Sequence, residues 1–257
     1  MRIARIAQPD GLAFAKIEGE GDDLTAVEIK DEPFGGTPTF TGRRWPLADV
    51  RLLAPFLPPK IIGVGRNYAD HAKELGNEVP AEPLLFFKPN TSVVGPNVEI
   101  KLPAVSERVD FEGELAVIIG QPCRDVPKAK AASVIMGYTI ANDVTARDLQ
   151  KKDVQFTRAK GFDTFCPLGP FIETEFDPSD VRVVTEVDGE VKQDGRTSLM
   201  VHDIPSLVEY VSGIMTLLPG DLILTGTPAG VGPIRAGQTV SVTVDGLGTL
   251  TNPVANR

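Results

Sequence analysis

The chain has 257 residues, a hydrophobic share of 42%, a charged share of 24% and a formal net charge of -9. These values are typical of a globular protein with a core large enough to fold without a disulfide or a structural zinc. The acidic balance argues against a nucleic-acid or anionic-membrane partner, and no apolar run is long enough to cross a bilayer. Cys123 and Cys166 lack CxxC spacing and no signal peptide is evident, so the sequence predicts a cytoplasmic protein with free thiols.

The first 55 residues predict a small β-rich unit. Short strand-like runs, split by Gly and Asp turns, lie at 3–6, 12–17 and 24–29. A proline-rich linker is expected over 47–59. We therefore divide the chain into an N-terminal domain, 1–55, and a larger domain, 56–257.

The larger domain predicts more strands than helices. The expected strands cover 60–64, 84–87 (buried), 111–119, 134–142, 181–188 with a hairpin partner from 191, 222–224 and 240–244. The expected helices cover 68–75, 129–134, a segment opening at a capping box in 145–148, and the amphipathic run 204–217. Strands and helices do not alternate regularly, so the pattern predicts an α+β fold.

Glu112 and Glu114 form the most informative pair in the sequence. Residues two apart on a strand share a face, so these carboxylates project side by side, while Leu115 and Val117 point the other way. Two ionised carboxylates at the start of a covered strand repel each other and are costly to desolvate, and a bound cation removes that penalty. The alternative is an edge strand with both carboxylates in water.

Asp143 offers a third carboxylate at the end of the strand predicted for 134–142. Taken alone, it is equally a turn residue ahead of a helix. The chain has only His71 and His202, which excludes a histidine-rich transition-metal site. Oxygen ligands favour Mg²⁺ or Mn²⁺, with Ca²⁺ also compatible.

His71 and Glu74 lie three residues apart in the helix predicted for 68–75, on one face. A carboxylate beside an imidazole orients it and strengthens it as a base, although a solvated surface pair has the same spacing. In a site that holds carboxylates and an anionic substrate, Lys160 and Lys88 would balance charge, and Lys88 is a candidate substrate-binding residue. The alternative for each lysine is a solvated side chain.

Two glycine-rich segments suggest nucleotide binding without meeting its requirements. The segment 225–232 lacks the Lys-Ser/Thr ending of a phosphate loop, and the turn at 63–65 lacks a third glycine. A nucleotide-binding oxidoreductase is therefore not favoured. The hydroxyls and backbone amides of Thr225 and Thr227 better suit a carboxylate-binding turn.

Five motifs occur in a fixed order along the larger domain. They are GRNYADH at 65–71, FEGEL at 111–115, NDVTARD at 142–148, KGFDT at 160–164 and LTGTPAGVG at 224–232. In this order they resemble the fumarylacetoacetate hydrolase superfamily over about residues 60–252. The N-terminal unit is similar to that of short bacterial members described as 2-hydroxyhepta-2,4-diene-1,7-dioate isomerases or oxaloacetate decarboxylases.

The resemblance implies a mixed β-sandwich roll, usually a homodimer, that binds Mg²⁺ or Mn²⁺. The implied metal ligands are Glu112, Glu114 and Asp143. It further implies a His71–Glu74 dyad under a lid that orders when substrate binds, with Lys160 against the substrate and Gln150 and Thr227 as polar contacts.

The function that the resemblance implies is that of a divalent-metal-dependent enzyme acting on small 2-oxo mono- or dicarboxylic acids through an enolate. Oxaloacetate decarboxylation and isomerisation of 2-hydroxyhepta-2,4-diene-1,7-dioate are the candidate reactions, with fumarylpyruvate-type acylpyruvate hydrolysis as the alternative. Longer family members carry a fourth acidic ligand ahead of the histidine, whereas Gly65-Arg66-Asn67 has none. That favours the short-chain subfamily over hydrolysis of fumarylacetoacetate itself. A non-catalytic module with a structural Ca²⁺ is the alternative from another class.

Overall fold

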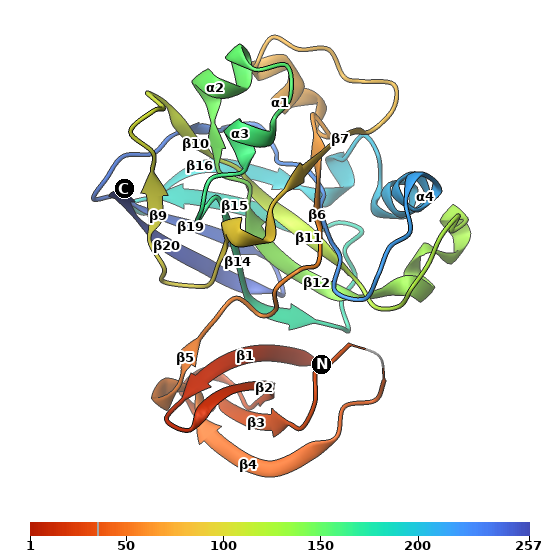
Figure 1. Ribbon diagram of the computed structural model, residues 1–257, viewed down its shortest axis with the longest axis vertical. Coiled ribbons are helices and arrows are strands. Elements are labelled where there is room, and N and C mark those ends of the chain that lie inside the picture. The colour runs from red at the N-terminus through yellow and green to blue at the C-terminus, as the bar shows by residue number, and fades with distance from the viewer. Residues whose placement is uncertain (35) are drawn as a thin grey trace.

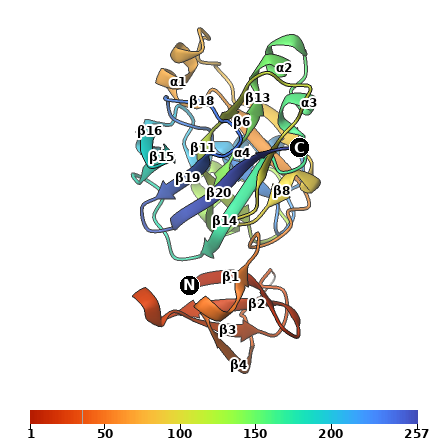
Figure 2. The same cartoon turned by 90° about the vertical axis from the view of Figure 1, so that its left-hand side faces the viewer.

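The computed structural model describes residues 1–34 and 36–257. Figure 1 shows the N-terminal unit below a larger body that carries the remaining sheets and the helices, and Figure 2 shows the same division from the side. No helix in the described ranges is long and apolar enough to span a membrane. Cys123 and Cys166 are both free, as expected.

The N-terminal unit is an antiparallel meander. Its strands are β1 (Arg2–Gln8), β2 (Gly11–Glu18), β3 (Thr25–Ile29), β4 (Phe40–Pro46) and β5 (Arg51–Leu52), with 3-10 turns at Gly21–Asp23 and Leu47–Asp49. Alternate small and branched residues such as Ala4, Ile6 and Ala15 pack into a core of their own. The expected linker over 47–59 is partly structured, because β5 pairs with β1.

The sheet of the N-terminal unit continues into the larger body. Strand β1 pairs with β14 (Cys166–Glu173) through Arg2 opposite Glu173 and Ile3 opposite Ile172. The strand order across the junction is β4-β3-β2-β1-β14-β12-β11-β17-β6-β7. One hydrogen-bonded surface therefore joins the two parts.

The rest of this large sheet supplies most of the site. Its strands are β6 (Ile61–Gly65), β7 (Leu84–Lys88), β8 (Val93–Val94), β11 (Gly113–Ile119), β12 (Ile135–Asn142) and β17 (Leu222–Leu224). Most pairings are antiparallel, but β17 runs parallel to β6, which makes the sheet mixed. The expectation that β7 is buried is wrong at Phe87, whose side chain is 52% exposed.

Strand β11 is covered on both faces, as its sequence pattern predicts. Leu115 and Val117 pack in one cluster with helix α4 (Ile204–Ile214) and with the second sheet. Ala116 and Ile118 pack in a separate cluster on the opposite face. Since apolar side chains fill both sides, β11 is an interior strand, and the edge-strand alternative is excluded.

A second sheet of five strands packs across the first. Its order is β16-β15-β19-β20-β9, comprising β16 (Glu190–Arg196), β15 (Arg182–Val187), β19 (Thr239–Val244), β20 (Gly248–Asn256) and β9 (Ile100–Leu102). Val183 and Val242 from this sheet join the cluster that contains Leu115. The expected α+β fold, a mixed β-sandwich roll, is confirmed, as is the hairpin β15–β16.

A short three-stranded sheet lies beside the helices. It consists of β10 (Val109–Phe111), β13 (Thr145–Ala146) and β18 (Gly232–Pro233). The single strand expected over 111–119 is therefore divided, because Phe111 pairs with β18 whereas Gly113 pairs with Asn142 in β12. Glu112 lies at the junction of the two sheets.

The helices are short, and three of them cluster at one end of the body (Figure 1). They are α1 (Ala69–Glu74), α2 (Arg147–Lys152) and α3 (Thr157–Lys160), and the 3-10 turns are Asn90–Ser92, Lys128–Val134 and Thr197–Leu199. The expected capping box is wrong: the Thr145 hydroxyl donates to the Asp143 carbonyl, and Asp148 accepts from Ser106 and Glu107. Helix α4 stops at Ile214, whose side chain is exposed rather than part of the apolar face.

Candidate active site

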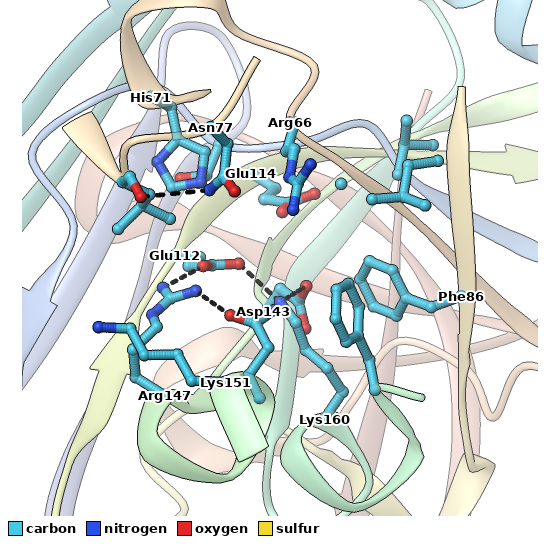
Figure 3. Close-up of a pocket in the computed structure, with 17 residues that line it drawn as sticks. Arg66, His71, Asn77, Phe86, Glu112, Glu114, Asp143, Arg147, Lys151 and Lys160 are labelled. Carbon is cyan, nitrogen blue, oxygen red and sulfur yellow. Dashed lines mark hydrogen bonds and ion pairs between the residues drawn. The ribbon is translucent and has the colours of Figure 1, made fainter. Parts of the chain in front are cut away.

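A pocket of about 300 Å³ opens where β6 and β12 end and β11 begins, beside α1, α2 and α3 (Figure 3). This volume is at the lower end of the range for small-molecule sites. Its polar lining residues are Arg66, His71, Asn77, Glu112, Glu114, Asp143, Arg147, Gln150, Lys151, Lys160 and Thr227. Phe86 and Phe156 lie edge to face at one side, and the Lys160 ammonium is 4.8 Å from the Phe86 ring centre.

The structure brings Glu112, Glu114 and Asp143 together. All three side chains are buried, and one carboxylate oxygen from each lies within 4.8 Å of the others. Backbone contacts fix this arrangement: the Asp143 N–H donates to the Glu112 carbonyl at 2.8 Å, and the Glu112 N–H donates to the Asn142 side chain at 2.9 Å. The three are thus placed by the junction of β10 and β11 and by the end of β12.

The residue between the two glutamates is a glycine because the second sheet packs tightly against the backbone at this position. A Cβ at Gly113 would lie 2.1 Å from the Thr185 hydroxyl and 2.9 Å from a Val242 methyl. The second sheet therefore approaches the backbone at this point more closely than any side chain would allow. Glu112 and Glu114 are held on the pocket side by this close packing.

Three buried cations bind two of the carboxylates. The Lys160 ammonium donates to Glu112 at 2.7 Å and to Asp143 at 2.5 Å. Lys88 donates to the other Asp143 oxygen at 2.6 Å, and Arg147 donates to the other Glu112 oxygen at 2.5 Å. Glu114 differs, because it accepts only the backbone N–H of Gly226, at 2.7 Å, and forms no ion pair with any described residue.

The pKa values of Glu112 and Glu114 are shifted in opposite directions. Burial alone would raise the pKa of Glu112, but the charges of Lys160 and Arg147 outweigh it and hold that pKa far below the usual range. Burial, followed by the charges of Asp143 and Glu112, raises the pKa of Glu114 well above its ordinary value. Glu114 is the carboxylate at which positive charge is lacking.

The donor set fits a hard divalent cation. Three buried carboxylates supply only oxygen ligands, the type that Mg²⁺ and Mn²⁺ prefer. The unmatched charge of Glu114 is the specific observation in favour, because a cation beside it would offset the penalty of burying an ionised carboxylate. Ligation by these three residues and the identity of the ion stay predictions.

His71 projects from α1 into the pocket (Figure 3). Burial lowers its pKa, which keeps the imidazole neutral and able to accept a proton. Its Nδ1 atom lies 3.6 Å from the Glu74 carboxylate and has no hydrogen-bond partner among the described residues. Glu74 itself lies outside the pocket lining and accepts the Gly230 N–H with both oxygens at 3.1 Å. The two side chains of the expected dyad are therefore neighbours without a hydrogen bond.

The predicted substrate contacts differ in their access to the pocket. Gln150 lines it and accepts from Arg147 at 2.6 Å through its carbonyl oxygen. Thr227 also lines it, but its hydroxyl donates to the Gly113 carbonyl at 2.8 Å and accepts from Gln193 at 2.6 Å. Lys88 is 2% exposed and absent from the pocket lining, because it lies behind Asp143.

The expected carboxylate-binding turn at Thr225 and Thr227 has a different role. The Thr225 hydroxyl donates to the Leu115 carbonyl at 2.8 Å, so both hydroxyl protons are directed to the backbone of β11. The loop therefore fixes β11, and it contributes the Gly226 N–H to Glu114. A substrate contact by Thr227 stays a prediction.

The sequence interpretation missed Arg147 and Asp110. Arg147 joins the two buried acids, donating to Asp110 at 2.9 Å as well as to Glu112. Asp110 is fully buried and also accepts a hydrogen bond from the half-exposed Arg108 at 2.8 Å. The available signal was a charged residue inside the apolar run Val109–Phe111, which calls for a buried partner.

Two family descriptions match the chain. "Fumarylacetoacetate (FAA) hydrolase C-terminal" matches residues 60–255, and "Rv2993c-like, N-terminal" matches residues 1–55. The chain belongs to the fumarylacetoacetate hydrolase family. The first match spans the whole acidic cluster and every residue that lines the pocket.

Relatives of this fumarylacetoacetate hydrolase family member include proteins with named activities. Protein Rv2993c of Mycobacterium tuberculosis is 62% identical, over 100% of this chain and 99% of its own length. The mitochondrial oxaloacetate decarboxylase of Dictyostelium discoideum is 46% identical, over 74% of this chain and 90% of its own. The mitochondrial oxaloacetate tautomerase FAHD1 of Oryza sativa is 48% identical, over 77% of this chain and 89% of its own length.

Solved structures show the same fold. A 5-carboxymethyl-2-hydroxymuconate delta-isomerase from Mycobacterium smegmatis superposes with a TM-score of 0.95 at 62% identity, covering 100% of both chains. A fumarylpyruvate hydrolase from Pseudomonas aeruginosa, in complex with Mn²⁺ and pyruvate, superposes with a TM-score of 0.75 at 31% identity, covering 80% of this chain and 92% of its own. Members of this family are enzymes that include isomerases, decarboxylases and hydrolases.

Proposed function

We propose that this family member is a divalent-metal-dependent enzyme that forms the enolate of a small 2-oxo acid. Oxaloacetate decarboxylation and isomerisation of 2-hydroxyhepta-2,4-diene-1,7-dioate are the two reactions favoured. The observation that carries the proposal is the buried acidic triad, which shares one pocket with His71 and Lys160 and leaves Glu114 without a cation. Relatives named for oxaloacetate and for an isomerisation support the choice of reactions.

The residues that would hold the metal are Glu112, Glu114 and Asp143. A bound Mg²⁺ or Mn²⁺ would supply positive charge opposite the oxygen that becomes negative as an enolate forms. Lys160 and Arg147 fix the orientation of Glu112, since they occupy its two oxygens separately. Bonds from Lys160 and Lys88 hold Asp143 in the same way.

His71 is the proposed proton carrier. Because burial lowers its pKa, it is a free base at neutral pH, and it faces the same pocket as the acidic triad. In decarboxylation, the bond between C3 and the departing carboxylate breaks, its electron pair forms the enolate, and C3 then takes a proton. In isomerisation, one carbon loses a proton and another gains one, with no loss of carbon.

Acylpyruvate hydrolysis is the second candidate. Glu74 lies 3.6 Å from His71 and is held by the Gly230 N–H, so a modest movement of either side chain would complete a dyad that activates water. The structural likeness to a fumarylpyruvate hydrolase favours this candidate. In that reaction the C–C bond to the acyl group breaks after water adds to the acyl carbonyl.

Kinetic assays of the purified protein test the proposal. Oxaloacetate, the heptadienedioate and an acylpyruvate are supplied separately, with Mg²⁺, with Mn²⁺, and after chelation. We expect turnover of at least one substrate that disappears on chelation and returns when metal is added. Turnover that persists after complete chelation, or none on any substrate with metal present, contradicts the proposal.

A structural Ca²⁺ site is the competing explanation for the acidic triad. Calorimetry separates the two, because a structural ion binds tightly without substrate and raises Tm sharply. The proposed function predicts weak Mg²⁺ binding that tightens when oxalate, an enolate mimic, is present. Tight Ca²⁺ binding that oxalate leaves unchanged favours the structural explanation.

A further inference from the structure

Two of the permanent cations that line the pocket have no acidic partner in the part of the chain that the structure describes. Lys160 and Arg147 are bound to carboxylates, whereas Arg66 and Lys151 form no ion pair or hydrogen bond with any described residue. Arg66 is half-buried, and Lys151 is exposed at the rim. A half-buried guanidinium without a partner is costly, and an anionic ligand would remove that cost.

The backbone holds Arg66 in a conformation that its side chain does not favour. Its φ angle is 58°, in the left-handed region where residues other than glycine are strained. The neighbouring Asn67 fixes the segment, because its amide donates to the Thr225 carbonyl at 2.8 Å and to the His202 carbonyl at 3.0 Å, and its oxygen accepts the His202 N–H. The direction in which the Arg66 side chain leaves the backbone is therefore set by the contacts of this loop.

Arg66 enters the pocket from the side opposite Arg147 and Lys160 (Figure 3). The acidic triad and Lys160 form the end of the pocket where the 2-oxo acid group of a substrate would be held under the proposed function. A ligand held there by its 2-oxo acid group would direct its far end toward the guanidinium. In oxaloacetate that end is the departing carboxylate, and in the heptadienedioate it is a carboxylate that does not react. Its planar fork matches a carboxylate through two parallel hydrogen bonds, which a lysine does not provide.

We propose that Arg66 binds a second carboxylate of the substrate, remote from the 2-oxo acid group, and selects dicarboxylates over monocarboxylates. The inference rests on the proposed function for which end of the ligand meets the metal ligands. A monocarboxylate of equal length would leave the guanidinium unmatched in the complex. Lys151 is the weaker choice, because an exposed and flexible ammonium loses more freedom for a solvent-screened contact.

The test compares matched ligands on Mg²⁺-loaded protein and its Arg66→Gly variant. Glycine accepts a φ of 58° without strain, so the substitution removes the guanidinium and keeps the loop. Calorimetry is done with 2-oxoglutarate and 2-oxopentanoate, which have equal carbon number but two carboxylates and one. In a separate experiment, kcat/KM for oxaloacetate is measured in both proteins as a readout of turnover.

We expect wild-type protein to bind 2-oxoglutarate more tightly than 2-oxopentanoate, by roughly tenfold or more. Arg66→Gly should weaken dicarboxylate binding by about 30-fold or more, the scale for removing one partner of a desolvated charge pair. Monocarboxylate binding should change by less than about threefold. Arg66→Lys should restore only part of the preference. Arg124→Gln, which removes an exposed charge away from the pocket, should leave the binding of both ligands unchanged.

Several outcomes overturn the inference. They are an equal loss for both ligand types in Arg66→Gly, no loss for either, no binding of any ligand to wild-type protein, or loss of selectivity in Lys151→Gln alone. Binding is measured without turnover, so the two proposals fail separately. Arg66-dependent dicarboxylate binding without any reaction contradicts the proposed function only, whereas metal-dependent turnover that is indifferent to Arg66 contradicts this inference only.

Discussion

Two groups of ionised side chains in this molecule are built differently. In the N-terminal unit, Glu28 of β3 accepts from Arg43 at 2.8 Å and 2.5 Å, and it also accepts from the Thr41 hydroxyl. Both carboxylate oxygens are matched, and the pKa of Glu28 is lowered, chiefly by the hydrogen bonds from Arg43. This group is complete without any other partner.

The group in the pocket is incomplete. Lys88, Arg147 and Lys160 satisfy Glu112 and Asp143, but Glu114 receives only a backbone N–H, and its pKa is raised by burial and by its acidic neighbours. A buried carboxylate without a cation destabilises the fold by itself, so its presence points to a ligand. The comparison teaches that the unmatched charge, more than the number of charges, marks the site.

Glu114→Gln gives the largest expected effect. The proposed metal loses a charged ligand, so activity should fall by about 10³-fold or more. The buried repulsion also disappears, so Tm of the metal-free protein should rise while the Mg²⁺-induced increase in Tm is lost. Paired melting curves with and without Mg²⁺ check both. A lower Tm in the metal-free variant would show that Glu114 is matched in a way the structure does not show.

Arg147→Met should be the most destabilising single change in the pocket. It leaves Asp110 and Glu112 buried without their shared cation, at a loss of about 3–5 kcal/mol of unfolding free energy. Urea denaturation measures the loss. Arg108 and Lys160 still contact these carboxylates. The double variant Arg147→Met with Asp110→Asn should recover part of the loss, because one of the two carboxylates that Arg147 joins becomes neutral. Loss below about 1 kcal/mol would argue against a buried network.

His71→Gln should slow the reaction and leave metal binding intact. Removing a general base or acid reduces rate by about 10²-fold or more, whereas His71 contributes no ligand to the acidic triad. The measurements are kcat and the Mg²⁺ affinity from calorimetry. Equal losses in both would place His71 in the metal site instead.

Glu28→Gln gives the smallest effect and sharpens the contrast with Glu114. Because hydrogen bonds from Arg43 lower the pKa of Glu28, its contribution to stability is present above the unfolded pKa and is lost as pH falls through the folded pKa. Wild-type Tm should exceed that of the variant at pH 7, and the difference should shrink on acidification. Activity should not change. A difference that grows at low pH contradicts this assignment.

The local arrangement of the acidic residues could be predicted from the sequence. The period-two spacing of Glu112 and Glu114, with apolar residues on both faces of the strand, predicted an interior strand bearing paired carboxylates, and the motif order predicted that Asp143 joins them. The partners of these acids could not be predicted, because Arg147 lies 35 residues from Glu112 and Lys88 lies 55 residues from Asp143. Periodicity describes one element at a time, whereas these contacts are set by how elements cross.

The same limit explains the errors. The strand expected over 111–119 is divided because β10 pairs with β18, which is distant in the sequence. The expected capping box does not form because the Asp148 carboxylate accepts a hydrogen bond from Ser106 and not from the helix N-terminus. Lys88 looked available to a substrate, yet it lies behind Asp143. Arg66 had no local signal, since its left-handed backbone depends on contacts that Asn67 makes with two other loops.

The pairing of β1 with β14 has a practical consequence for anyone wishing to shorten this protein. The end of β14, at Ile172 and Glu173, lies between β1 and β12, whereas β8 pairs with its start at Cys166 and Pro167. The end of β14 is therefore an inner strand only while residues 2–3 remain in place. Deleting the first 55 residues would turn the end of β14 into an open edge with unpaired N–H and C=O groups, the kind of surface that recruits strands from other molecules. The larger domain on its own should therefore self-associate rather than stay dispersed.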